Sequence, residues 1–175
     1  MFYIFGLGNP GEEYGSNRHN AGRMAVEFFA KNNSNKKIIT ILPDTFMNKS
    51  GSAVAKFIKS KKAAQNISVV YDDIDLPVGT IKISYDKSSG GHNGLESVIK
   101  ALKTQQFTRI RIGVSPTTPR GKIKKPKGEK TVLKFLLGDF KLAEIALLKK
   151  VFKKVSEAIE VIVEEGRERA MNRFN

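Results

Sequence analysis

Both histidines of this 175-residue chain are followed by asparagine, with glycine close by. His19 lies in the segment RHNAG (residues 18–22) and His92 in the segment GGHNG (90–94). Histidine has an unperturbed pKa that lets it accept or give a proton near neutral pH, and the asparagine amide both donates and accepts hydrogen bonds. The two pairs therefore predict hydrolytic polar chemistry.

The apolar pattern predicts the elements that must position these residues. Apolar or alternating runs predict strands at residues 2–7, 38–42, 67–71, 81–85 and 109–114. Helical spacing predicts helices within residues 21–29, 54–58, 95–102 and 145–162. Either Ser16 or Asn17 is expected to cap the first helix, which places His19 in or beside its first turn. Strands that alternate with helices predict an α/β fold: a single three-layer αβα domain over residues 1–175 with a twisted, mostly parallel (mixed) central sheet.

Two basic segments lie outside this pattern. Residues 115–130 are rich in Pro, Gly and Lys and have no apolar period, so we expect a mobile basic loop there. Residues 167–175 follow the long final helix as a basic C-terminal tail.

Composition excludes several classes of protein. Without cysteine there is no disulfide framework, no thiolate nucleophile and no cysteine zinc site, and two histidines are too few for a histidine-rich metal cluster. The first residues lack a basic region before their apolar stretch, and no apolar run approaches the ~20 residues of a membrane span. We therefore expect a cytoplasmic protein that has no metal and no membrane partner.

The net charge indicates the class of partner. Lys and Arg number 31 against 17 Asp and Glu, which gives +14 at pH 7. Such a field attracts polyanions and speeds their encounter with the protein, so nucleic acid is the leading class. The alternative is that the lysines only keep the surface soluble. The sign of the charge does not separate RNA from DNA or from anionic lipid.

The segment GLGNPG (residues 6–11) formally matches the G-x-G-x-x-G motif of dinucleotide-binding proteins. In that motif the third glycine lies within the helix that receives the pyrophosphate. Here the segment EEYG (12–15) delays the helix and adds negative charge. We therefore interpret the glycines as a tight turn, which leaves Asn9 at the end of a strand.

Unusual polar residues follow the predicted strands at the point where each strand ends. Asn9 follows the first strand and Asn48 the second, Asp72 ends the third, and His92 and Asn93 follow the fourth. Ligands of α/β sheets gather at the carboxyl ends of the strands. The pattern therefore predicts that these side chains converge on one site.

The chain closely resembles the bacterial peptidyl-tRNA hydrolase family over nearly its whole length. Tyr14 and six ordered motifs carry the resemblance: GLGNPG (6–11), RHNAG (18–22), TFMN (45–48), DDIDLP (72–77), GGHNGL (90–95) and RIRIG (109–113). The resemblance implies an enzyme that cleaves the ester joining a peptide to the terminal ribose of tRNA. It also implies a protein that is usually monomeric, needs no metal or cofactor, and has peptidyl-tRNA rather than DNA as its partner.

By the same resemblance, His19 is the catalytic base, Asp72 is its orienting carboxylate, and the substrate cleft is formed by Asn9, Asn48, His92 and Asn93. The chemistry agrees: a helix N-terminus keeps the imidazole neutral, while Asp72 fixes its tautomer and stabilises the developing charge. We expect water to be the nucleophile. Either Asn9 or Asn93 could steady the oxyanion.

Other roles stay open between binding and structure. His92 either positions the substrate or holds its loop, and Asn20 could be structural. Tyr14 and Met47 could wall the site near the scissile bond, although core packing explains them almost as well.

The chain also departs from the family. In the family's clamp for the tRNA 5′-phosphate, Arg111 matches one of two basic residues, but Ser84 stands at the other position, so Lys82 or Lys87 is the expected substitute. Residues 30–38 are shorter than usual, which predicts a simpler sheet edge. The rival interpretation is an RNA-binding protein of the same fold without the reaction.

Overall fold

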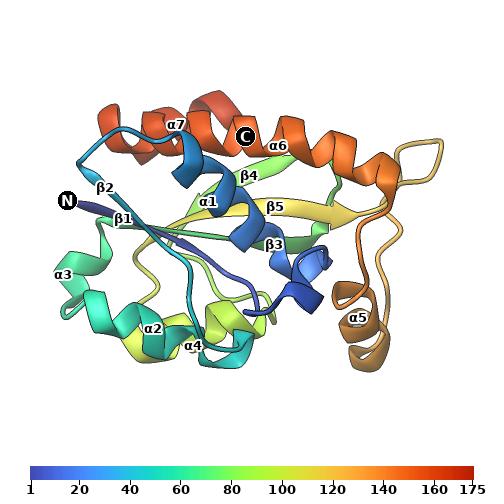
Figure 1. Ribbon diagram of the computed structural model, residues 1–175, viewed down its shortest axis with the longest axis horizontal. Helices are drawn as coiled ribbons and strands as arrows, with labels where there is room; N and C mark the ends of the chain where they lie inside the picture. Colours follow the sequence, from blue (N-terminus) through green and yellow to red (C-terminus); the bar gives the residue numbers. More distant parts are fainter.

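A five-stranded sheet runs through the middle of the molecule in the computed structural model, which describes residues 1–175 (Figure 1). Its strands are β1 (Phe2–Gly6), β2 (Ile38–Ile41), β3 (Ile67–Pro77), β4 (Ile81–Tyr85) and β5 (Thr108–Ser115), in the order β2-β1-β3-β5-β4. Only β4 is antiparallel to its neighbour, β5. The predicted α/β class with a mostly parallel, mixed sheet is confirmed.

Helices cover both faces of the sheet. One face carries α1 (Ala21–Asn32), α6 (Leu142–Glu164) and α7 (Arg167–Phe174), and the other carries α2 (Ser50–Phe57), α3 (Lys61–Ala64) and α4 (Asn93–Leu102) (Figure 1). A further helix, α5 (Glu129–Leu136), lies at one end. Three 3₁₀ turns complete the chain: η1 (Glu12–Tyr14), η2 (Arg18–Asn20) and η3 (Met47–Lys49). None of the helices combines the length and apolarity needed to cross a membrane.

The core divides into two apolar clusters because successive strand residues point to opposite faces. Ile4 and Val70 belong to a cluster of 24 buried residues on the side of α1 and α6. Phe5 and Val69 belong to a cluster of 13 on the side of α2 and α4. Burial on both faces explains why β1 and the first half of β3 are apolar without alternation.

Strand β3 is longer than the sequence pattern predicts. The apolar run stops at Tyr71, yet the strand continues through Asp72 and Asp73 to Pro77, with an irregular register against β5 between Asp73 and Pro77. Pairing with β5 holds these polar residues in the sheet. The two aspartates therefore sit on a rigid element rather than in a loop.

Helices α3, α5 and α7 lie where the sequence pattern predicted none. Helix α5 begins at Glu129, so the last residues of the predicted basic loop are helical. Helix α7 occupies most of the basic tail and buries Ala170 and Phe174 in the core. At its end the Asn175 side chain accepts from the backbone N–H of Ile83 at 2.7 Å and donates to the Ile83 carbonyl at 3.0 Å. The tail thereby covers the edge strand β4.

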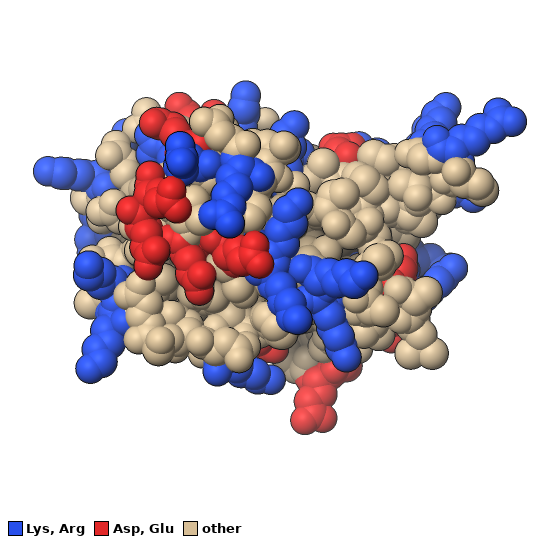
Figure 2. Space-filling view, turned by 90° about the horizontal axis from the view of Figure 1, so that it is seen from above, with Lys and Arg blue, Asp and Glu red and all other residues tan.

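The exposed face of α6 carries its two kinds of charge in separate halves. Lys149, Lys150, Lys153 and Lys154 lie in the first half, and Glu157, Glu160 and Glu164 in the second half. Figure 2 shows the face on which α6 and α7 lie, with basic and acidic side chains gathered in different areas. The positive charge of the chain is therefore not confined to one site.

Replacing Phe174 by Ala tests the packing of α7. Because the ring is 6% exposed within the main cluster, we expect the free energy of unfolding to fall by roughly 3 kcal/mol. Urea unfolding followed by circular dichroism measures the change, and the exposed neighbour Arg173→Ala is the control. Equal stability of the two variants would show that the tail does not pack.

Candidate active site

A cleft of about 820 Å³ opens at the carboxyl end of β3. The 88–93 loop forms one wall with its polar groups, and α5 forms another with Val132, Leu133 and Leu136. His19 and Asp72 lie between these walls. The cleft thus joins polar reactive groups to an apolar surface.

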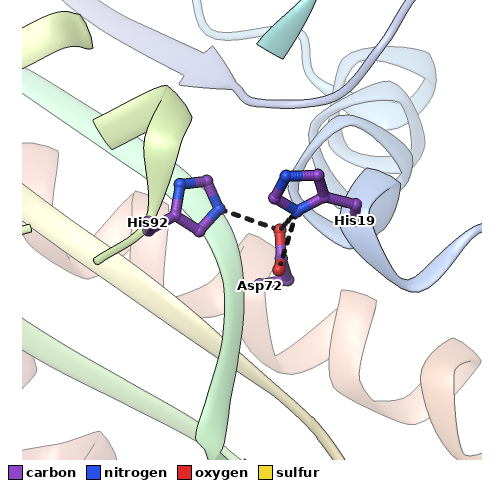
Figure 3. Close-up of side chains that lie close together, drawn as sticks. All are labelled: His19, Asp72 and His92. Carbon is purple, nitrogen blue, oxygen red and sulfur yellow. Dashed lines mark hydrogen bonds and ion pairs between the residues drawn. The ribbon is translucent and has the colours of Figure 1, made fainter. Parts of the chain in front are cut away.

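Both histidines contact the same carboxylate. His19 Nδ1 lies 3.0 Å from each oxygen of Asp72, and His92 Nε2 lies 3.0 Å from Asp72 Oδ1 (Figure 3). The two imidazole rings are 4.9 Å apart between centroids. Their side chains are nearly buried, and that of Asp72 is 1% exposed. The residues come from η2, β3 and the residue that precedes α4.

Gly22 lets η2 approach β3 closely enough for this contact. A Cβ atom at this position would collide with the backbone carbonyl of Val70, two residues before Asp72. Only glycine therefore allows the start of α1 to cross β3 here. The glycine of the RHNAG segment thus has a physical role in bringing His19 to the aspartate.

The electrostatics determine which nitrogen atoms carry protons. Burial alone would raise the pKa of Asp72, but His19 and His92 lower that pKa well below its usual range. Asp72 is therefore ionised at neutral pH and can only accept hydrogen bonds. Neutral His19 must donate from Nδ1, which leaves the lone pair of Nε2 free.

Asp72 also sets the proton affinity of His19. Burial lowers the pKa of the imidazole, but the charge and hydrogen bond of Asp72 outweigh burial and leave this pKa above its ordinary value. The expected effect of a helix N-terminus, which would favour the neutral form, is thus not the dominant one. His19 is a stronger base than a free histidine.

His92 is fixed from three sides. Its Nδ1 accepts from the backbone N–H of Leu95 at 3.2 Å, so the ring caps α4 and must carry its proton on Nε2, which faces Asp72. The Tyr71 ring meets it edge-on at 4.9 Å between centroids. Burial raises the pKa of Tyr71 to about 12, so this phenol stays neutral. These contacts hold the ring at the edge of the cleft, and substrate contact by His92 stays a prediction.

Asn9 is held in a defined orientation. Its side-chain oxygen accepts from the Met47 N–H at 2.7 Å, and its backbone N–H and C=O both bond to the Asn20 side chain at 2.9 Å. No protein group accepts from its Nδ2. Asn20 is therefore structural, and Asn9 presents a free N–H₂ group.

The remaining predicted substrate residues occupy different environments. Asn93 is exposed on the cleft wall at the start of α4, whereas Asn48 is exposed on η3 outside the residues that line the cleft. Met47 is 5% exposed and belongs to the second core cluster. Tyr14 is half-buried with its ring edge against Phe46. Substrate contact by these four residues stays a prediction.

The predicted phosphate contacts do not all lie in the cleft. Arg111 and Lys87 line it, but Lys82 does not, although it is paired with Arg111 in the register of β4 and β5. Arg111 Nε donates to Asp73 Oδ2 at 2.6 Å. Ser84 also lines the cleft. The positive charge of Arg111 is thus partly offset by Asp73. Of the two lysines expected to replace the missing clamp residue, Lys87 is the one that lines the cleft.

Several residues of the site are not evident from the sequence. Asp73 uses both carboxylate oxygens: Oδ1 accepts from the Asp75 backbone N–H at 2.7 Å, and Oδ2 pairs with Arg111. The sequence pattern did not predict α5, which forms one wall of the cleft. This short helix directly follows the basic segment, which has no apolar period. Lys125 of that segment pairs with Asp75, which brings the basic loop to the cleft.

The three side chains at the centre of the site are also close enough together to hold a metal cation. The ligand atoms of His19, Asp72 and His92 lie within 4.8 Å of one another. However, the His92 nitrogen that faces Asp72 is the protonated one, because Leu95 occupies the other lone pair. Binding a metal would break the cap of α4, so the donor set fits hydrogen bonding better than metal coordination.

Comparisons with known proteins agree with this geometry. The family model described as peptidyl-tRNA hydrolase matches residues 3–175. A peptidyl-tRNA hydrolase of Alkaliphilus oremlandii is 38% identical over 195 residues, with 100% of both chains covered. One of Thermotoga maritima is 40% identical over 187 residues and covers 98% of this chain and 96% of its own.

A solved structure extends the agreement to three dimensions. The crystal structure of peptidyl-tRNA hydrolase from Acinetobacter baumannii has a TM-score of 0.83 and 29% sequence identity, and covers 98% of this chain and 93% of its own. The sequence comparisons and the fold comparison thus identify the same family, and the chain belongs to the peptidyl-tRNA hydrolase family.

Proposed function

We propose that this protein hydrolyses the ester between peptide and tRNA in peptidyl-tRNA, with His19 as the base that activates water. The observation that carries the proposal is the pairing of His19 Nδ1 with Asp72, because it leaves Nε2 as a free base at a cleft of about 820 Å³. Family membership supports the substrate.

The reaction follows from this arrangement. Water gives a proton to His19 Nε2 as its oxygen attacks the ester carbonyl, and Asp72 stabilises the imidazolium that forms. The N–H₂ group of Asn9 donates to the oxyanion. The imidazolium then returns the proton to the ribose oxygen as the ester bond breaks. The products are free tRNA and a peptide with a free carboxyl group.

The cleft supports recognition of both halves of the substrate. The apolar side of α5 suits peptide side chains, and Asn93 on the opposite wall can hydrogen-bond the peptide backbone. Arg111 and Lys87 suit the phosphates of the tRNA. The other expectations stay predictions: a monomeric, cytoplasmic enzyme that binds no DNA and needs no metal or cofactor.

Replacing His19 by Ala should abolish most turnover, since general base catalysis supplies roughly 10²- to 10⁴-fold in rate. Binding of tRNA should persist because the phosphate contacts remain. The measurement is release of intact tRNA and peptide from peptidyl-tRNA with a chelator present, alongside a filter-binding assay. Near-normal turnover by this variant would contradict the assignment. An inactive wild-type protein that still binds tRNA would favour the non-catalytic RNA-binding alternative.

The pH profile tests the role of Asp72. Only neutral His19 accepts a proton, so kcat/KM should fall as the pH drops through its raised pKa. In Asp72→Asn the carboxylate charge is gone and burial lowers the pKa of His19. The acid limb of the profile should therefore move to lower pH while the plateau falls, because the tautomer is no longer enforced. An acid limb at unchanged pH would exclude control by Asp72.

Salt dependence tests the phosphate contact of Arg111. Arg111→Gln should weaken tRNA binding and lower the slope of log affinity against log salt by about 1. Asp73→Asn should have the opposite effect on affinity, since it removes the carboxylate that competes with phosphate. Lys62→Gln on α3, at the other end of the sheet in Figure 1, removes the same charge as a control. Identical slopes for Arg111→Gln and Lys62→Gln would refute a specific contact.

A further inference from the structure

Arg18 lies beside the base but takes no part in the proposed reaction. Its side chain is 9% exposed, and Nη2 donates to Glu144 Oε2 at 3.0 Å. Its guanidinium lies over the Phe135 ring at 4.6 Å and near the Phe140 ring at 5.5 Å. The Arg18 backbone N–H donates to the Gly138 carbonyl at 3.1 Å. All of these partners lie in residues 135–144, where α5 ends and α6 begins.

The turn that carries His19 is thus anchored on both sides. Arg18 connects it to the junction of α5 and α6, and Asn20 connects it to Asn9 at the end of β1. Asn17 strengthens the first anchor by donating to Asp139 at 2.7 Å. The His19 imidazole itself has one side-chain hydrogen-bond acceptor, Asp72. Its placement therefore depends on how the backbone turn is held.

The same anchor fixes the opposite wall of the cleft. Val132, Leu133 and Leu136 of α5 line the cleft, while Phe135 of this helix packs on the Arg18 guanidinium. Glu144, the ion-pair partner, also accepts from the Lys141 backbone N–H at 2.7 Å and so belongs to the first turn of α6. Arg18 thereby links the turn that carries His19 to the helix that forms the apolar wall.

Stability alone gives no reason for a charge at this place. Removing two charges from water costs free energy, and a well-packed apolar residue is often as stabilising as a buried ion pair. What the guanidinium adds is geometry, because it donates to Glu144 through Nη2 while its plane lies over the Phe135 ring. Gly138 leaves room for it, since a Cβ there would lie 3.3 Å from Arg18 Nη1.

We infer that Arg18 is a positioning residue, which holds the His19 turn against the junction of α5 and α6 so that Nδ1 stays in contact with Asp72. The inference rests on the proposed function for the role of His19 as a base. It concerns the placement of that base and adds no group to the reaction.

Arg18→Met tests the inference because methionine fills space without the fork or the charge. Its kcat should fall about tenfold with little change in KM, since small misplacements of a catalytic group are costly in rate. The pKa of His19, followed by NMR, should fall toward its ordinary value as the contact with Asp72 loosens. Arg18→Lys, which keeps the charge, should recover part of kcat.

Arg23→Met is the matched control. Arg23 lies on the following helix α1 and donates to the Pro43 carbonyl at 2.8 Å, away from α5. It should leave kcat and the titration of His19 unchanged. If Arg18→Met does not fold, Glu144→Gln decides the question, because it removes the ion pair at constant shape and should lower kcat and the His19 pKa in the same direction.

Unchanged kcat and unchanged His19 titration in folded Arg18→Met, or in Glu144→Gln if the former does not fold, would overturn the inference. Equal effects of Arg23→Met would also overturn it by showing a general loss of packing. The NMR titration needs no substrate. A wild-type protein without hydrolase activity would therefore refute the proposed function and still leave the positioning role open to measurement.

Discussion

The buried carboxylate of Asp72 is the constraint on which the rest of the site depends. An ionised group removed from water is costly unless it is paired and hydrogen-bonded. Here the compensation comes from two imidazole N–H groups, which separate segments of the chain deliver to within 3.0 Å. Strand β3 supplies the charge, and η2 and the start of α4 must converge on it. Satisfying one charge thus fixes the position of both histidines.

That constraint explains which parts of the site could be predicted from the sequence. His19, Asp72 and His92 could be found because each follows or ends a readable strand or starts a readable helix, and parallel strands end on the same edge. The contact of both histidines with one carboxylate could not be predicted. It depends on the path of the 88–93 loop and on the close crossing of α1 over β3, and neither leaves a periodic pattern.

The parts of the fold that were missed share one physical property. Helices α5 and α7 are short and strongly charged, and their buried residues are few. Eight residues give few turns over which an apolar period can be recognised, and tertiary packing rather than propensity stabilises such short helices. The same holds for Arg18, whose sequence context says only that it precedes a histidine. Its role becomes visible when Phe135 and Glu144, more than a hundred residues away, are seen around it.

The charges at the cleft are balanced rather than simply basic. Arg111 is paired with Asp73, and Lys125 with Asp75, in a chain whose net charge is +14. A hydrolase that acts on peptidyl-tRNA must release a tRNA that retains every phosphate of the substrate. Phosphate contacts therefore stabilise substrate, transition state and product alike, and such uniform binding does not raise kcat. If these cations bind the tRNA phosphates as proposed, the carboxylates paired with them limit this affinity and favour product release.

The orientation of amides distinguishes the two asparagines that could stabilise the oxyanion. Preorganised donors stabilise developing charge because they need no rearrangement during the reaction. The Asn9 oxygen is engaged by the Met47 N–H, and its backbone is held on both sides by Asn20, so its N–H₂ group has one available direction. Asn93 is exposed and its side chain has no protein partner, so it would have to be ordered by the substrate. In the proposed reaction, preorganisation therefore favours Asn9 over Asn93 as the oxyanion donor.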